Sequence, residues 1–233
     1  SALVVKGSWF LVVRLWFDVM PGVVTLSSAQ LLAGMGAAAI VIGSVVAVRQ
    51  ERLKLLVAYS TLAQIGYLFL MFPLAFDAAS GALVHGGALT GGLLQAISHA
   101  TAKAGMFMAA GLVYAALGHD RIADLAGVAR AMPVTVLTFA VAGLALMGVV
   151  PSGAYLAKKL LLYAADDSGQ WWWTIVLQGG AVFTAGYVVL VLVNALRRGG
   201  APITLVVRVS RRSEFAALAL AVWLGKAEPW LIL

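Results

Sequence analysis

The sequence contains no cysteine, and this absence removes several kinds of chemistry at once. Without thiols the chain has no disulfide, no thiolate metal site and no cysteine nucleophile. Charge is also scarce, because only 11% of the residues are charged whereas 63% are hydrophobic. A soluble domain of 233 residues has too much surface for its volume to hide so much apolar material. The composition therefore predicts an integral membrane protein.

Acidic residues are the scarcer sign of charge, with 9 Asp and Glu against 16 Lys and Arg, which gives a net charge of +7. In a soluble protein this excess would suggest a nucleic-acid partner. In a membrane protein basic residues mark the loops that stay in the cytoplasm, so we expect no nucleic acid. No signal peptide is apparent, since the chain begins at Ser1 close to an apolar run. We expect a piece of a longer protein, or one whose start is missing.

Long apolar runs without alternation dominate the chain. Only helices and closed barrels satisfy the backbone in lipid, and runs of this length and pattern favour helices. The prediction is an all-α integral membrane fold with about seven transmembrane helices, one of them broken. The helices are expected at 2–20, 28–48, 54–74, 84–117, 132–165, 171–196 and 213–232.

The charged loops alternate between two sides of this arrangement. One side receives the basic stretches at 49–54, 119–130 and 197–212, whereas the other receives Asp18, Asp77, Asp166 and Asp167. Basic loops favour the cytoplasm, so the N-terminus of this segment is expected inside and its C-terminus outside. The residues 171–173, all Trp, open the sixth helix where an interfacial aromatic belt would lie.

The segment from Gly92 to Leu117 carries His99 and Lys103 near its middle. About 20 apolar residues cross the hydrocarbon core, so this run spans it with some tilt. Ionisable groups at that depth are costly and usually mark an ion path. The spacing of four residues places both side chains on one face of the helix. A purely structural hydrogen-bonding role is the competing interpretation.

The segment 132–165 is too long for one straight span and contains Gly148, Pro151 and Gly153 at its centre. Proline removes a backbone donor and clashes with the preceding turn, so we expect a broken helix. Non-helical backbone at membrane depth usually lines a hydrated cavity. Lys158 and Lys159 follow the break, and adjacent positions point about 100° apart. We expect Lys158 to face the interior and Lys159 to face elsewhere.

Lys6 is the remaining candidate for a buried cation, although its place near a helix start also suits a lysine that snorkels to the interface. Buried lysines and histidines on different helices, joined by water, form a proton relay. The predicted spans hold no carboxylate near mid-membrane, so the lysines switch charge or meet an acid from outside this segment. Four polar residues of the third helix either line water or pack against polar neighbours, namely Tyr59, Ser60, Gln64 and Tyr67.

Four stretches together resemble the antiporter-like subunits of respiratory complex I, Mrp-type cation/proton antiporters and membrane-bound hydrogenases. They are VVKGSWFLVVRLW, ERLKLLVAYSTLAQIGYLFL, ISHATAKAGMFMAAGLVY and MPVTVLTFAVAGLALMGVVPSGAYLAKKLLL. They occur in the order and with the spacing of that family, and the resemblance covers about residues 1–198. One departure is that Val150 stands where the family usually has the first of two prolines.

The resemblance implies two inverted five-helix repeats, of which this chain looks like the second. It implies a linking helix at 1–26, the second repeat at 27–198 with the broken helix at 132–165, and a basic cytoplasmic loop with a terminal helix at 199–233. Lys6 resembles the lysine that links the half-channels. Lys103, with His99 beside it, resembles the central lysine, and Lys158 resembles the terminal lysine after the break.

The function implied is a membrane subunit that translocates protons, or exchanges Na⁺ for H⁺, within a multi-subunit complex of the bacterial plasma membrane. The partners implied are the lipid bilayer and other membrane subunits, including the missing first repeat. No cofactor motif or metal site is apparent, so any redox chemistry of an NADH:quinone oxidoreductase-like complex belongs to partner subunits. Two alternatives stay open: a subunit that energises uptake of another solute such as inorganic carbon, and a structural membrane anchor that does not conduct.

Overall fold

The computed structural model describes residues 4–83, 86–199, 205–207 and 209–223, and these residues form a bundle of helices. Apart from two isolated β-bridges, no extended pairing occurs among the residues described. The predicted all-α membrane fold is therefore confirmed. The long elements are α1 (Val4–Arg14), continued by a π-helix (Leu15–Val19), α2 (Leu26–Val48), α3 (Leu53–Phe69), α5 (Gly86–Leu117), α7 (Pro133–Met147), α8 (Gly153–Asp167), α9 (Trp172–Leu196) and α10 (Arg211–Trp223).

These elements follow the predicted segments closely. Short helices α4 (Met71–Leu74) and α6 (Val128–Ala131) lie in the connections after α3 and before α7. The segment expected to break does so, because α7 ends at Met147 and α8 begins at Gly153. The terminal helix expected at 213–232 begins at Arg211 and is described to Trp223, and its remainder lies outside the described residues.

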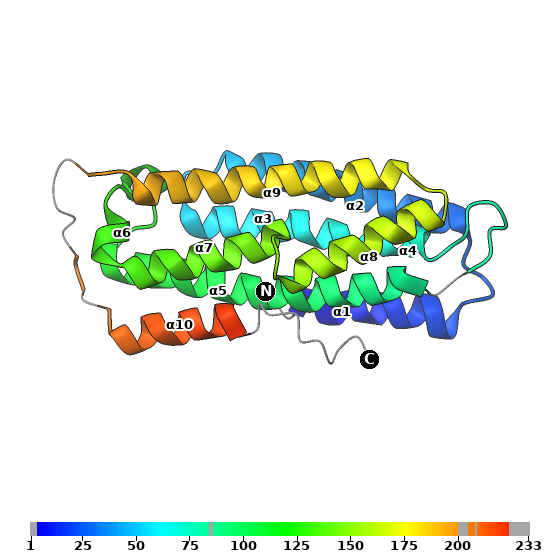
Figure 1. Cartoon of the computed structure of the whole chain (residues 1–233), viewed down its shortest axis with the longest axis horizontal. Coiled ribbons are helices and arrows are strands. Elements are labelled where there is room, and N and C mark those ends of the chain that lie inside the picture. The colour runs from blue at the N-terminus through cyan, green and yellow to red at the C-terminus, as the bar shows by residue number, and fades with distance from the viewer. Residues whose placement is uncertain (1–3, 84–85, 200–204, 208, 224–233) are drawn as a thin grey trace.

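Helices α3 and α5 form the centre of the bundle (Figure 1). Helix α3 packs against α2, α5 and α9, and α5 packs against both halves of the broken helix and against α10. In the most apolar 18-residue stretch of the span Leu53–Leu74, 67% of the residues are buried. In the corresponding stretches of α2 and α9 only 33% are buried. The outer helices α2 and α9 therefore turn much of their surface outward, while α3 is enclosed by protein.

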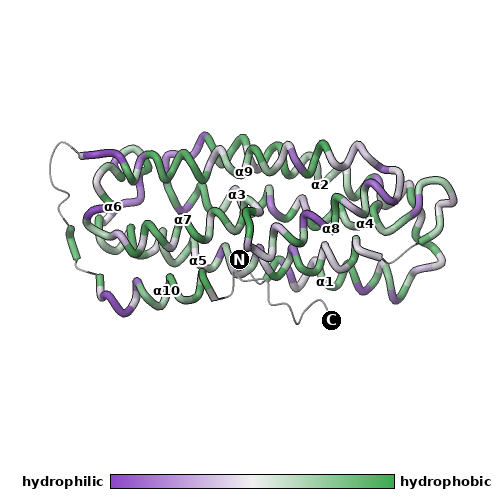
Figure 2. The backbone as a smooth tube through the Cα atoms, viewed as in Figure 1, coloured by the Kyte–Doolittle hydropathy of each residue, from purple (hydrophilic) through white to green (hydrophobic). Residues whose placement is uncertain are grey.

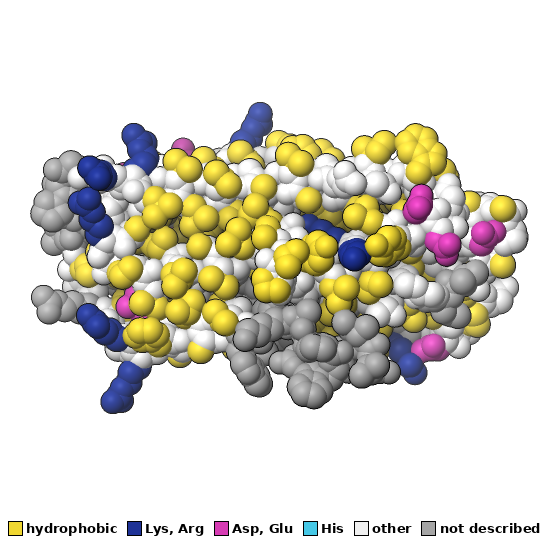
Figure 3. Space-filling view, viewed as in Figure 1, with side chains coloured by type: hydrophobic (Ala, Val, Ile, Leu, Met, Phe, Trp, Pro, Cys, Tyr) yellow, Lys and Arg dark blue, Asp and Glu magenta, His cyan; other side chains and the backbone are white. Residues whose placement is uncertain are grey.

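Four helical stretches are long and apolar enough to cross a membrane, namely Leu26–Val48, Leu53–Leu74, Gly86–Leu117 and Trp172–Leu196. Figure 2 shows that hydrophobic residues follow the bundle along its length and that hydrophilic ones gather toward its ends. On the face shown in Figure 3, Lys and Arg side chains cluster at the end near α6, and most of the Asp and Glu side chains lie at the opposite end. We call these the basic end and the acidic end.

The basic end is held by Asp120, which caps the start of α3. Its carboxylate accepts the backbone N–H of Lys54 at 3.1 Å, and its carbonyl oxygen accepts the N–H of Leu53 at 2.7 Å. The first N–H groups of a helix lack partners within it and attract negative charge. Asp120 is only 6% exposed, so this contact fixes the loop after α5 against the first turn of α3.

The acidic end is held by Gln170, a fully buried residue between α8 and α9. Its amide donates to the carbonyl oxygens of Pro73 at 2.7 Å and Phe76 at 3.0 Å. Its own oxygen accepts from Gln30 of α2 at 2.6 Å. Trp173 then donates to Gln30 at 3.1 Å and is buried, so only Trp171 and Trp172 of the three tryptophans are exposed.

Replacing Asp120 by Ala is expected to lower the thermal unfolding midpoint of the purified protein. Loss of a side chain that accepts an N–H of the first helical turn costs about 1 kcal/mol, or about 2–4 °C for a chain of this size. The matched control is Asp124→Ala, because Asp124 meets Arg121 at 3.7 Å with both side chains more than half exposed. Exposed pairs contribute little. Equal shifts in the two variants would contradict the role given to Asp120.

Candidate functional site

Lys103 lies at the centre of the bundle with no exposed surface. Its ammonium group donates to the carbonyl oxygen of Val57 at 3.1 Å and to the hydroxyl of Ser60, both on α3. No carboxylate contacts it among the residues that the structure describes. These oxygen atoms therefore take the place of water around the lysine. Their hydrogen bonds offset part of the free-energy cost of removing the side chain from water.

His99 lies one turn before Lys103 on the same face of α5, as the spacing predicts, and is also fully buried. Neither ring nitrogen has a hydrogen-bond partner in the described part of the chain. Lys6 of α1 is 8% exposed, which places it in the interior and not at the interface. It is close enough to interact electrostatically with both His99 and Lys103.

Lys158 lies at the break between α7 and α8. Its ammonium group donates to the carbonyl oxygen of Met147 at 3.0 Å and approaches that of Leu146 at 3.5 Å. The last carbonyl groups of a helix lack partners within it and carry partial negative charge. The break therefore creates the acceptors that hold Lys158, which is 8% exposed.

Two residues shape the break itself. Gly148 ends α7 in the left-handed region, with φ of 80°, a conformation that a residue with a Cβ rarely adopts. The Ser152 hydroxyl caps α8 by accepting the N–H of Tyr155 at 3.1 Å. Val150 in place of a proline thus leaves the interruption intact over residues 148–152.

Lys159 points away from the interior, as predicted, and lies 5.5 Å from the centre of the Tyr163 ring. A cavity of about 320 Å³ adjoins both lysines and is lined also by Met147, Tyr155 and Gln178. Lys158 therefore lies between the protein interior and a cavity that opens on the surface.

A group of buried polar residues occupies the region between Lys103 and Lys158. Of the four polar residues noted on the third helix, Ser60, Gln64 and Tyr67 are fully buried, whereas Tyr59 is 39% exposed. The structure adds three that the sequence analysis did not name, which are Gln95 of α5 and Thr184 and Tyr187 of α9. Their signal in the sequence is faint: single polar side chains in apolar helices, with Gln95 one turn before His99.

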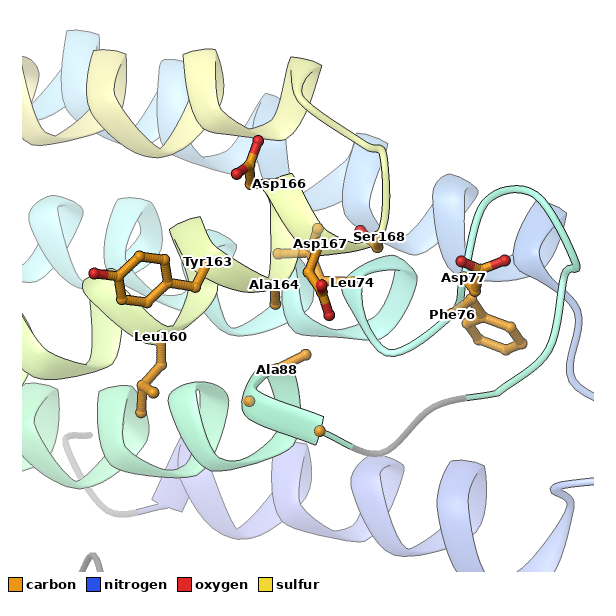
Figure 4. A pocket seen from close by; sticks show the side chains of 12 residues that line it. Leu74, Phe76, Asp77, Ala88, Leu160, Tyr163, Ala164, Asp166, Asp167 and Ser168 are labelled. Carbon is orange, nitrogen blue, oxygen red and sulfur yellow. The ribbon is translucent and has the colours of Figure 1, made fainter.

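The acidic end holds a second cavity, of about 350 Å³, between the ends of α4, α5 and α8 (Figure 4). Asp167 points from α8 toward Ala88 at the start of α5, and Asp166 points the other way. Asp77 accepts the N–H and hydroxyl of Ser80 at 2.6 and 2.7 Å, which hold the pKa of Asp77 below its usual value. Within the described residues no group of His, Cys, Asp or Glu could hold a metal ion.

Comparison with known proteins gives a consistent result. The model of the family described as "NADH:quinone oxidoreductase/Mrp antiporter, TM" matches residues 1–184. The chain is 34% identical over 200 residues to NADH-quinone oxidoreductase subunit N of Desulforudis audaxviator, covering 85% of this chain and 38% of that protein. It is 34% identical over 169 residues to a Na⁺/H⁺ antiporter subunit of Alkalihalophilus pseudofirmus, covering 69% of this chain and 20% of that protein.

The fold is shared with a solved structure of the Mrp complex from Dietzia sp., with a TM-score of 0.72 and 21% identity. The alignment covers 84% of this chain and 43% of the matched chain. The chain thus spans about two fifths of the length of the subunit N and of the Mrp chain that it matches.

Replacing Gly148 by Ala is expected to destabilise the protein by about 1–2 kcal/mol, because a Cβ is strained at positive φ. The new methyl group would also lie 3.1 Å from the Cδ atom of Lys158. The thermal unfolding midpoint should fall by about 2–4 °C per kcal/mol. Gly111→Ala is the control, since a Cβ there meets nothing within 4 Å. An unchanged midpoint in Gly148→Ala would show that the break tolerates a side chain.

Proposed function

This chain belongs to the NADH:quinone oxidoreductase/Mrp antiporter transmembrane family, and from that premise we propose that it translocates protons through its buried lysines and histidine. The observation that carries the proposal is Lys103, a fully buried lysine without a carboxylate partner in the described chain. Burying an ionisable group at that position costs free energy, and such groups usually take part in ion movement.

The proposed relay has three stations, which lie on α1, α5 and α8. Lys6 and His99 form the first, on α1 and α5, Lys103 the second, and Lys158 at the helix break the third. A proton that binds at the first station repels a proton held by Lys103. This repulsion drives the proton of Lys103 onward to Lys158. Lys158 then exchanges the proton with the cavity of about 320 Å³ beside it. The same stations operate in reverse if the driving gradient is reversed.

The chain carries this path as part of a larger assembly. It spans about two fifths of subunit N and of the Mrp chain and 20% of the antiporter subunit. We assign residues 1–26 to the linking helix, 27–198 to the second repeat and 199–233 to the basic loop and terminal helix. The first repeat would come from upstream sequence or from a partner subunit. The basic end is assigned to the cytoplasmic side of the plasma membrane, since its loops hold most of the Lys and Arg.

A structural anchor that does not conduct is the competing function. Such an anchor gains nothing from burying Lys6, His99 and Lys103, because the burial of each ionisable group costs stability that a structural role does not require. The exchange of Na⁺ for protons is compatible with the same three stations, and the name of one relative includes it.

Lys103→Met is expected to reduce proton translocation by about tenfold or more while the complex still assembles, since Met keeps the length of the side chain and removes the proton site. The measurement is dye-detected acidification in vesicles that contain the whole complex. Lys159→Met is the matched control, because Lys159 is exposed one position along the same helix as Lys158. Equal fluxes in both variants would exclude Lys103 from the path and favour the anchor.

A further inference from the structure

The second and third stations of the proposed relay are too far apart for direct proton transfer. Lys103 contacts Ser60, and the ammonium group of Lys158 lies 5.2 Å from the centre of the Tyr67 ring. Ser60 and Tyr67 are seven residues apart on α3, which at 1.5 Å per residue is roughly 10 Å. A hydrogen bond spans only about 3 Å, so other groups must carry the proton across this interval.

Buried hydroxyl groups fill the interval. The Tyr187 and Thr184 hydroxyls of α9 both accept from the Gln64 amide nitrogen, at 3.4 and 3.0 Å, and Gln64 lies one turn after Ser60 on α3. Thr184 also contacts the carbonyl oxygen of Gly180, the residue against which the Tyr67 hydroxyl packs. Ser60, Tyr187, Thr184 and Tyr67 are all fully buried, so the row is shielded from bulk water. We call these four residues the hydroxyl row.

Two glutamines hold the hydroxyl row in place. The Gln64 amide donates to Thr184 at 3.0 Å and to Tyr187 at 3.4 Å. Its oxygen accepts from Gln95 at 3.2 Å, which determines the direction in which the Gln64 amide points. The two N–H groups of the Gln64 amide both donate, one to each hydroxyl oxygen. The hydroxyl protons of Thr184 and Tyr187 are therefore free to donate to other members of the row.

Two links of the row are open, at Ser60 and at Tyr67. The Ser60 hydroxyl donates to the carbonyl oxygen of Val57 at 3.0 Å and has to turn toward Tyr187. The Tyr67 hydroxyl is buried and near Thr184 but makes no well-formed hydrogen bond within the described chain. The Thr184 hydroxyl instead donates to the carbonyl oxygen of Gly180 at 3.0 Å. Gly180 is also the residue against which the Tyr67 hydroxyl packs, since a Cβ at position 180 would overlap that oxygen. Rotation of one threonine hydroxyl would therefore close the link at Tyr67.

We propose that the Tyr67 hydroxyl is the switch that passes protons between Lys103 and Lys158, closed when Thr184 turns its proton from Gly180 to Tyr67. This inference rests on the proposed proton-translocating function and assigns the residues that connect its stations. The α3 stretch that contains Ser60, Gln64 and Tyr67 thereby gains a role beyond helix packing.

The transfer balances at every atom. Lys103 gives a proton to Ser60, Ser60 gives its own to Tyr187, Tyr187 to Thr184, Thr184 to Tyr67, and Tyr67 to neutral Lys158. Each oxygen loses one O–H bond and gains one, so only the two lysines change charge. Lys158 must turn from the face of the Tyr67 ring to its hydroxyl, and its contacts to the α7 carbonyl groups set the cost of that movement.

The test compares Tyr67→Phe with Tyr59→Phe in vesicles that contain the whole complex, energised by its own electron donor or cation gradient. Tyr67→Phe keeps the ring and removes only the hydroxyl, whereas Tyr59 lies on the same helix with its side chain 39% exposed. Proton flux is expected to fall by about tenfold or more in Tyr67→Phe and to stay unchanged in Tyr59→Phe. Assembled complex and substrate-driven turnover are quantified for each variant.

A second pair retains every hydroxyl and separates a proton-carrying role from a structural one. Gly180→Ala places a methyl group against the Tyr67 hydroxyl, whereas a Cβ at Gly179 meets nothing within 4 Å. We expect slower flux and a larger ratio of the rates in H₂O and D₂O for Gly180→Ala only, because the displaced link makes proton transfer limiting. If Tyr67→Phe fails to assemble, this pair decides the question by the same ratio.

Lys103→Met, measured in the same assay, separates failure of the proposed switch from failure of the proposed function. If Lys103→Met abolishes flux while Tyr67→Phe and Gly180→Ala match their controls, the switch is overturned and the proposed function stands. If Lys103→Met retains full flux, the proposed function falls, and the switch falls with it.

Discussion

The structure depends on how a lysine is accommodated in the interior of the bundle. Lys103 is fully buried on α5, and the oxygens of Val57 and Ser60 on α3 are its partners. A cation that lost these acceptors would keep its full desolvation penalty, so α3 and α5 must stay in contact at this level of the membrane. The central position of these two helices follows from that requirement as much as from their apolar surfaces.

The break between α7 and α8 solves the same problem by a different route. A continuous helix would satisfy all its carbonyl groups internally and leave none for a lysine. Ending α7 at Met147 frees carbonyl oxygens at membrane depth, and Lys158 binds them. Lys158 thereby gains a partner made only of backbone, and backbone acceptors remain charge-neutral while the lysine gains or loses a proton.

Polar residues of α3, α5 and α9 form a buried, hydrogen-bonded group near the two lysines. Gln64, Thr184 and Tyr187 are joined by hydrogen bonds from α3 to α9, and they meet no solvent. Buried polar groups of this kind are tolerated only when nearly all are satisfied. The buried polar atoms that lack a partner in the described chain include both ring nitrogens of His99 and the Tyr67 hydroxyl.

The sequence by itself determined the membrane class, the helical segments, the break at 148–152 and the opposite orientations of Lys158 and Lys159. These features are local, because each depends on residues of a single segment. They follow from the length of the apolar run, from Pro and Gly at the break, and from the angle between adjacent helical positions. Only the tertiary structure decided that Gln95, Thr184 and Tyr187 join Gln64 at the centre. A helix that is apolar on every side carries little amphipathic signal, so its sequence does not fix which face turns inward. That rotation is set by contacts between helices, and the grouping of polar side chains across α3, α5 and α9 exists only after the helices have packed.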